Sequence, residues 1–314
     1  MENVKSSDIA IVVFTYGRLE HTKITLETLS RNIGFNNYPV VIYSDGPKVG
    51  HEQKVEEVRK ILREFKSNNP NVTVIERKTN LGLEKSIISG ITDALKKYPG
   101  VIAIEDDIRT SPSFLEYMAN MLTMYKSEKN VGCISGYNHP IELMTIPKLY
   151  PYEIFFAPRT SSWGWATWRD RWEDVDWDVK DIDSFISNKK LQKEFNLGGD
   201  DLSRMLINQV KKGIDTWDIQ WCYHNFKKGR LTIYPTISYV ENIGMDGTGV
   251  HCGKTSGFRN DDLNKNSNIK TPSTVSINPE LLKNFKKAST LTPKMYYELI
   301  LDRVLKILKL PTKK

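Results

Sequence analysis

Short apolar runs alternate with helix-like stretches through residues 1–137, and this alternation constrains the fold more than any other feature of the sequence. Five β-branched runs have the length and composition of buried strands: Ala10–Thr15, Val40–Ser44, Val72–Glu76, Val101–Glu105 and Val131–Ser135. Apolar residues at helical spacing between them predict four helices: Glu20–Asn32, Gln53–Phe65, Glu84–Tyr98 and Ser113–Lys126. Strands joined by helices favour right-handed crossovers and a parallel sheet covered on both faces. We therefore predict an α/β fold with a mostly parallel sheet.

The second half of the sequence, from about Asn138, is less regular. It contains a helix-like segment, a strand-like segment and a glycine-rich stretch: Asp218–Lys228, Leu231–Tyr234 and Gly244–Gly257. It also holds an aromatic block in which Trp168 and Trp172, four residues apart, suggest one buried helix face. The predicted organisation is a domain built from two halves, then a linker, then a C-terminal helix: residues 1–137, 138–258, 259–290 and 291–314.

The excess positive charge lies at the C-terminal end. The chain has 45 Lys and Arg against 38 Asp and Glu, a net charge of +7. Residues 283–314 hold nine basic and two acidic side chains, so the rest of the chain balances at 36 of each sign. A neutral body lacks the basic surface that contacts with nucleic-acid phosphates require. We therefore expect no nucleic-acid partner.

Three further features favour a soluble, cytoplasmic protein. No apolar run approaches the ~20 residues that a membrane-spanning helix needs. The first ten residues, MENVKSSDIA, lack the apolar stretch of a secretory signal. The three cysteines, Cys133, Cys222 and Cys252, are too few and too scattered for a disulfide framework, which points to a reducing compartment.

The C-terminal segment has the pattern of a basic amphipathic helix. Between Met295 and Leu310, eight leucine, isoleucine and valine residues are flanked by Lys294, Arg303, Lys306 and Lys309. Such a helix can lie in an anionic membrane interface, which would make the protein peripheral on the inner face of the cell membrane. Docking of the apolar face on the chain's own body or on a second subunit explains the pattern equally well.

Three adjacent carboxylates, Glu105-Asp106-Asp107, follow the predicted strand Val101–Glu105. Because like charges repel, such a cluster at a strand end suits a bound cation. Hard oxygen ligands favour Mg²⁺ or Mn²⁺, usually shared with substrate phosphates. The alternative is a solvated acidic turn. Ligands in parallel sheets bind beyond the carboxyl ends of the strands, and this position favours the metal site.

Polar residues also follow the other predicted strands of the first half. The first strand leads into Thr15, Tyr16, Gly17 and Arg18, and the second into Asp45-Gly46. The third leads into a basic loop and a helix, where Arg77, Asn80, Gly82 and Lys85 favour an anion at the helix N-terminus. Taken singly, each of these is equally compatible with an ordinary turn or a capped helix.

As an ordered set, VVFTYGR, YSDG, NLGLEKSIISGI and IAIEDD resemble the nucleotide-sugar-binding half of GT-A-fold glycosyltransferases, especially family 2. The acidic motif is similar to the EDD form found in N-acetylglucosaminyltransferase I. The resemblance implies that Asp107 binds Mn²⁺ or Mg²⁺. It also implies a nucleotide-sugar donor held by ten residues: Thr15, Tyr16, Arg18, Asp45, Arg77, Asn80, Gly82, Lys85, Glu105 and Asp106.

The resemblance continues more loosely into the second half. Ser162–Ala166 (SWGWA) is similar to a Gly-Trp loop of that enzyme, and Trp217–Trp221 (WDIQW) to its Trp-Asp-Asp-Trp segment, although Ile-Gln departs from the paired acids. These matches imply that Asp218 is the general base and that the acceptor contacts four residues: Trp163, Gly164, Trp165 and Trp217. The alternative makes Trp217 and Trp221 core residues of a helix that Asp218 caps. Asp200-Asp201 is a second carboxylate pair, which we interpret as a helix cap.

His251 lies in the glycine-rich stretch, where the resemblance implies a histidine near the metal or the diphosphate. A zinc site made from Cys222, His224, His251 and Cys252 is the alternative, but these residues lack the usual ligand spacing. We interpret the stretch itself as a mobile loop that orders over bound donor.

The predicted function is that of an inverting, metal-dependent glycosyltransferase. It would move a monosaccharide from a nucleoside-diphosphate sugar, expected to be a UDP-sugar, to a glycan or lipid-linked glycan in bacterial surface polysaccharide synthesis. One alternative is a sugar nucleotidyltransferase, although the segment FTYGRLEH has one glycine where that class has a glycine-rich loop. The other alternative is a non-catalytic carbohydrate-binding or scaffold protein, which the tryptophans would also suit.

Overall fold

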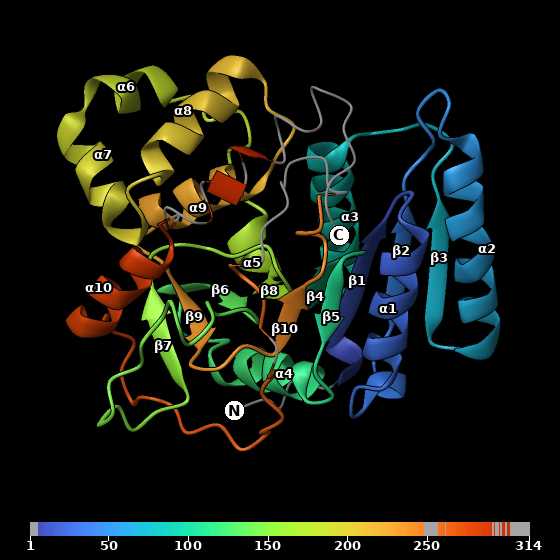
Figure 1. The fold of residues 1–314 in the computed structure, drawn as a ribbon, viewed down its shortest axis with the longest axis horizontal. Coiled ribbons are helices and arrows are strands. Elements are labelled where there is room, and N and C mark those ends of the chain that lie inside the picture. The colour runs from blue at the N-terminus through green and yellow to red at the C-terminus, as the bar shows by residue number, and fades with distance from the viewer. Residues whose placement is uncertain are drawn as a thin grey trace.

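The computed structural model describes residues 6–247, 257–260 and 262–290, together with 292, 295, 297–298 and 300–301. Its centre is one eight-stranded sheet in the order β3-β2-β1-β4-β8-β6-β9-β7 (Figure 1). The strands are β1 (Ile9–Thr15), β2 (Val40–Ser44), β3 (Val72–Glu76), β4 (Gly100–Glu105), β6 (Val131–Ser135), β7 (Ile154–Ala157), β8 (Trp165–Trp168) and β9 (Leu231–Pro235). Strands β3, β2, β1 and β4 pair in parallel, and all five predicted strands are present. The predicted mostly parallel α/β fold is confirmed.

Helices cover both faces of the sheet because alternate residues of the buried strands point to opposite sides. Ile9, Ile11 and Val13 of β1 pack in one core with α1 (Leu19–Ser30), α2 (Glu52–Asn68) and α4 (Phe114–Met124). Ala10, Val12 and Phe14 pack on the other side with α3 (Leu83–Lys97). All four predicted helices of the first half are thus present. Short 3₁₀ turns lie at Ser6–Asp8, Phe35–Asn37 and Asn196–Gly198.

The second half of the chain extends the same sheet and adds a helical layer. Strand β8 runs antiparallel between β4 and β6, and β7 pairs antiparallel with β9. Trp168 is therefore the last residue of a strand, and only Trp172 lies in a helix, α5 (Arg169–Trp172). The added layer consists of α6 (Ile182–Ser187), α7 (Lys189–Phe195), α8 (Leu202–Lys212) and α9 (Asp218–Lys227) (Figure 1). The sequence predicted α9 and β9, and its interpretation of Asp200-Asp201 as a helix cap agrees with the start of α8, where Asp201 is the N-cap residue without a side-chain cap hydrogen bond.

A small second sheet lies beside the acidic motif. Strand β5 (Ile108–Thr110) follows Asp107 directly and pairs antiparallel with β10 (Val240–Asn242). The amide of Ile243 then donates a hydrogen bond to the carbonyl oxygen of Asp107 at 2.9 Å. A segment more than 130 residues away in the sequence is thereby held against the acidic motif, and no local pattern predicted this pairing.

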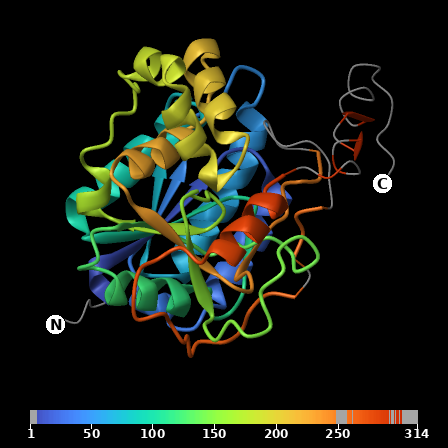
Figure 2. The ribbon, with the colours of Figure 1, turned by 90° about the vertical axis from the view of Figure 1, so that its left-hand side faces the viewer.

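The segment predicted as a linker, residues 259–290, contains a helix that the sequence analysis did not anticipate. Helix α10 (Pro279–Ala288) begins at Asn278, whose side chain accepts hydrogen bonds from the amides of Glu280 and Leu281. Leu281 and Phe285 are buried against β7 and β9, and Figure 2 shows α10 lying along the body of the protein. Most of residues 291–314 lie outside the described part of the chain. Among the helices that are described, none is long and apolar enough to cross a membrane.

Two buried histidines predict a pH-dependent component of stability. Burial lowers the pKa of His139 to about 3 and, despite nearby Asp174, that of His224 to about 4. Below pH ~6.5 the unfolded chain protonates these residues while the native protein does not, so stability falls by about 1.4 kcal/mol per pH unit for each histidine. Urea midpoints of wild type and H139Q, compared between pH 7 and 5, isolate the contribution of His139. The contributions of all other titratable groups are the same in both proteins and cancel. We expect acid to destabilise H139Q less than wild type, and equal slopes would contradict this.

Candidate functional site

Arg18 connects the end of β1 to the acidic motif at the end of β4. Its Nε donates to Asp106 Oδ1 at 3.1 Å, and a terminal nitrogen contacts both Asp106 and Asp107, the latter at 2.9 Å. The amide of Tyr16 donates to Asp106 Oδ2 at 3.2 Å. The structure therefore brings these predicted donor residues together. It also engages Arg18 with carboxylates of the protein, whereas the sequence prediction left it available to a phosphate.

The acidic motif concentrates more negative charge than Arg18 offsets. Burial, with Asp107, Asp106 and Asp218 adding, raises the pKa of Glu105 to about 8. Burial also raises the pKa of Asp107, although Arg18 opposes that shift. Ionised carboxylates in this position need a compensating cation.

The ends of β1 and β2 are joined by an aromatic contact that the sequence analysis missed. The Tyr16 hydroxyl lies 2.9 Å from His51 Nδ1 and accepts a hydrogen bond from the amide of Lys48 at 3.0 Å. His51 immediately precedes α2 and carried no motif that would have identified it. Thr15, also predicted to contact the donor, is buried and directs its hydroxyl to the Tyr43 carbonyl.

Asp45 holds a loop of the protein. Its buried carboxylate accepts hydrogen bonds from the amide of Leu81 at 3.1 Å and from the Asn80 side chain at 3.0 Å. The amide of Gly82 lies 3.3 Å from the same carboxylate. With its oxygens engaged in this way, Asp45 shapes the surface of the site, and the nucleotide contact predicted for it stays a prediction.

Arg77 and Lys85, both near the N-terminus of α3, differ in whether their side chains contact the protein or face solvent. The Arg77 guanidinium lies over the ring of Tyr43 and binds Ser86 and Ser89 on α3, with a distance of 2.9 Å to Ser89 Oγ. Lys85 is exposed on the first turn of α3. Of these two predicted donor contacts, Lys85 is the one whose charge faces outward.

The N-terminus of α3 receives a carboxylate of the protein. Asp215 Oδ2 accepts a hydrogen bond from the amide of Leu83 at 3.0 Å, and Oδ1 accepts one from Glu84 at 2.8 Å. The sequence analysis expected a bound anion at this helix N-terminus, with a capped helix as the alternative, and in the structure a carboxylate 131 and 132 positions away caps the helix. Asp215 carried no signal in the sequence.

Asp218 is the first residue of α9 and lies near the acidic motif. The Thr216 hydroxyl donates a hydrogen bond to its Oδ1, and the side chain is partly exposed. Its charge adds to the raised pKa of Glu105, as the last of the causes after burial, Asp107 and Asp106. The other carboxylate pair is engaged in ion pairs, because Asp201 is bound by Arg159 at 2.7 and 3.1 Å and Asp200 by Lys286.

Two of the predicted acceptor residues are in the hydrophobic core. Trp165 and Trp217 are 1% and 2% exposed, and their ring centroids are 4.8 Å apart. Since a ring needs free surface to stack on a sugar, this burial is inconsistent with the predicted contact. Gly164 is buried as well, with φ +60° and Phe114 close by. Trp163 is partly exposed and packs edge-on against Tyr137 at 4.5 Å.

The residues at Asp107 fit a divalent ion that is shared with a substrate. In the described part of the chain no three His, Cys, Asp or Glu side chains converge as a closed metal site. Mg²⁺ commonly uses one or two carboxylates and completes its shell with water and phosphate oxygens. Asp107 can supply such a carboxylate, since Arg18 binds it through Oδ2. His251 and Cys252 lie outside the described residues, so their predicted roles stay predictions.

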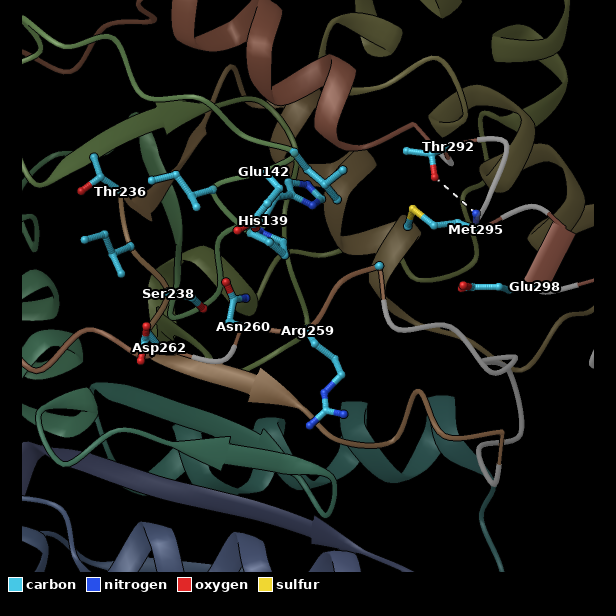
Figure 3. Close-up of a pocket in the computed structure, with 15 residues that line it drawn as sticks. His139, Glu142, Thr236, Ser238, Arg259, Asn260, Asp262, Thr292, Met295 and Glu298 are labelled. Atoms are coloured by element: carbon cyan, nitrogen blue, oxygen red, sulfur yellow. Dashed lines mark hydrogen bonds between the residues drawn. The ribbon is translucent and has the colours of Figure 1, made fainter. Parts of the chain in front are cut away.

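A hollow of about 830 Å³ lies beyond the carboxyl ends of β6 and β9, which run in the same direction as β4 (Figure 3). His139, Ser238 and Asn260 line one part of it. Arg259 extends from the hollow to the buried Glu241 on β10, which also binds Arg109 of β5. The hollow and the acidic motif are thus at the same edge of the sheet and are connected through β5 and β10.

The model of the GNT-I family matches residues 2–227. Among solved structures, the mannosyltransferase PcManGT from Pyrobaculum calidifontis, in complex with GDP-Man and Mn²⁺, is 15% identical with a TM-score of 0.38, over 52% of this chain and 45% of that one. TarS 1–349 of S. aureus is 13% identical with a TM-score of 0.42, over 74% and 59%. Its complex with UDP-GlcNAc is 12% identical with a TM-score of 0.41, over 74% and 57%. The chain spans about half the length of these proteins, and the likenesses are too distant to bear on its substrate.

Proposed function

The chain belongs to the GNT-I family, a family of GT-A-like glycosyltransferases, and we propose that it transfers a monosaccharide from a nucleoside-diphosphate sugar to a hydroxyl group of a glycan. The observation that supports this most directly is the Glu105-Asp106-Asp107 motif at the carboxyl end of β4, which Arg18 holds from the end of β1. A carboxylate cation site, together with Asp218 as a carboxylate base, would suit a displacement at an anomeric carbon.

We place the donor, proposed to be a UDP-sugar, along the carboxyl ends of β1, β2 and β4. Tyr16 and Lys85 border this edge, while Asp45, Asn80 and Arg77 shape it through their internal hydrogen bonds. Arg18 holds Asp106 and Asp107 in position. Asp107 would hold the divalent ion, Mn²⁺ or Mg²⁺, which would neutralise charge on the leaving diphosphate.

The proposed transfer inverts the anomeric centre. The acceptor oxygen forms a bond to the anomeric carbon while the bond from that carbon to the diphosphate breaks, and the acceptor proton passes to Asp218. Thr216 donates to Asp218 Oδ1 and so orients the carboxylate, with Oδ2 as the atom that takes the proton.

We propose that the acceptor approaches through the hollow beyond β6 and β9. Polar side chains such as Asn260 and apolar ones such as Ile237 alternate on its walls, a mixture that suits hydroxyl groups and the apolar faces of sugars. Trp163 packs against Phe258, next to this hollow. A surface polysaccharide or its lipid-linked precursor of bacterial type is the acceptor class we propose.

A donor screen tests the proposed function. The purified chain is incubated with Mn²⁺ or Mg²⁺ and a panel of UDP-, GDP- and dTDP-sugars, and nucleotide release and glycan products are followed by mass spectrometry. We expect one donor class to be hydrolysed or transferred, with loss of the reaction in a chelator. Glycan binding without turnover of any donor would overturn the proposal in favour of a scaffold.

The C-terminal segment adds a proposed membrane contact. Its support is the basic, apolar-faced sequence of residues 291–314 and the exposure of Tyr297, Ile300 and Leu301. At about 1 kcal/mol per basic residue near an anionic surface, the triple variant R303Q/K306Q/K309Q should bind about 100-fold more weakly. Flotation with phosphatidylglycerol liposomes measures this. The control K189Q/K190Q/K193Q removes three charges from α7, and equal flotation of both variants would refute the role of the tail.

A further inference from the structure

We infer that Asp215 is a positioning residue, which sets the location of Asp218 by tying the loop before α9 to the N-terminus of α3. This inference rests on the proposed function, in which Asp218 is the base. Asp215 is exposed on the surface, and the role inferred for it depends on its contact with α3 in the first half of the domain.

The contact between Asp215 and α3 is built for a carboxylate. Both oxygens are used, at 3.0 Å to the amide of Leu83 and 2.8 Å to the amide of Glu84. These are free amides at the beginning of a helix of 15 residues, where the helix dipole adds to the attraction. Gly82 permits the approach, since a Cβ there would lie 2.8 Å from Asp215 Oδ2.

The loop that carries Asp215 also makes hydrogen bonds to α8. It begins at Gly213, in the left-handed conformation with φ +61°, directly after α8. The amide of Ile214 bonds to the Gln209 carbonyl, and the Gln209 side chain bonds to the Thr216 carbonyl at 3.3 Å. At the end of the loop, Trp217 is held in the core with Trp165 of β8, and Asp215 attaches the earlier part of the loop to α3.

A second hydrogen bond crosses the same boundary on the other side of Asp218. Gln220, which is buried, donates through Nε2 to Glu84 Oε1 at 2.8 Å and to the Trp177 carbonyl at 3.1 Å. Asp218 therefore lies between two contacts that both end on the first turn of α3. That turn continues from the loop that Asp45 holds at the donor side of the site.

The arrangement makes the distance between base and donor depend on Asp215. Displacement of a catalytic group by about 1 Å can cost about 10²-fold in rate without affecting substrate binding. Loss of Asp215 should consequently lower kcat while leaving the KM for the donor nearly unchanged. A purely structural role for Asp215 would instead lower the amount of folded protein and leave kcat per folded molecule as in wild type.

The test compares D215A, D215N and the control D183A in transfer assays over a range of donor concentrations, which give kcat and the KM for the donor. Asp183 is an exposed acid on α6 with its own lysine partner, so D183A makes the same change in charge and size elsewhere. We expect kcat to fall about 10- to 100-fold in D215A, to be partly restored in D215N, which keeps one acceptor oxygen, and to be unchanged in D183A. Urea midpoints report whether each variant is folded.

The experiment distinguishes failure of the proposed function from failure of the positioning role of Asp215. If wild type turns over no donor, the proposed function fails and Asp215 has no reaction to serve. If wild type is active and folded D215A has the kcat of wild type, or loses donor affinity in place of kcat, then Asp215 does not position the base and the inference is overturned.

Discussion

Replacement of Asp107 by asparagine is expected to lower metal-dependent transfer by about 10³-fold, the scale on which loss of one preorganised charge at a reacting centre affects kcat. Asparagine keeps the size of the side chain and an oxygen for the 2.9 Å contact with Arg18. It removes the negative charge that would hold a divalent ion against the donor diphosphate. The loss should therefore appear in chemistry and in metal affinity, while the fold is retained.

Two measurements separate these effects. Calorimetric titration of Mn²⁺ in the presence of UDP should give weaker binding in D107N than in wild type, and transfer assays should give the loss of rate. The variant D93N is a suitable control, because Asp93 is an exposed acid on α3 paired with Lys96. Activity of D107N close to that of wild type at any Mn²⁺ concentration would remove Asp107 from the proposed site.

Replacement of Asp218 by asparagine is expected to separate binding from catalysis. A general base contributes about 10²–10⁴-fold to rate, so transfer should fall by that factor. The amide can still accept the hydrogen bond from Thr216, which keeps the start of α9 in place. Donor and metal affinity should remain near wild type, because the proposed role of Asp218 is to take a proton from the acceptor.

This prediction needs donor binding and transfer on the same protein samples. Calorimetry with a UDP-sugar and Mn²⁺ gives the first, and mass spectrometry of the glycan product gives the second. D183N provides the matched control, as an exposed acid in the same helical layer. Transfer at the wild-type rate in D218N would assign the base to another group, and loss of donor affinity would mean that Asp218 belongs to the donor site.

Arg18 and Asp45 illustrate how far the sequence predicts the site. Their positions after β1 and β2 follow from the strand pattern, since parallel strands end at one edge of a sheet. Their partners do not follow, because Arg18 binds carboxylates 88 and 89 positions away and Asp45 binds amides 36 and 37 positions away. These hydrogen-bond partners depend on which strands pair with one another, and local sequence patterns do not predict that pairing.

The tryptophans and Asp215 show which features of the site the sequence could not predict. A tryptophan suits both a core and a sugar-binding surface, so composition could not distinguish the burial of Trp165 and Trp217 from exposure. Asp215 has no motif, and its role follows from the free amides of a helix in the other half of the chain. Sequence patterns report periodicity and residue type. The roles of these residues depend instead on which parts of the folded domain pack against them.

The sequence by itself determined the α/β class, five of the six strands and the four α-helices of residues 1–137, and the placement of the acidic motif at the end of β4. These follow from the periodicity of apolar residues, which is a local property. Only the tertiary structure decided that β8 enters the sheet antiparallel, that β10 lies beside Asp107, and that Asp215 binds the N-terminus of α3. These depend on contacts between residues far apart in the sequence, which the packing of the whole domain selects.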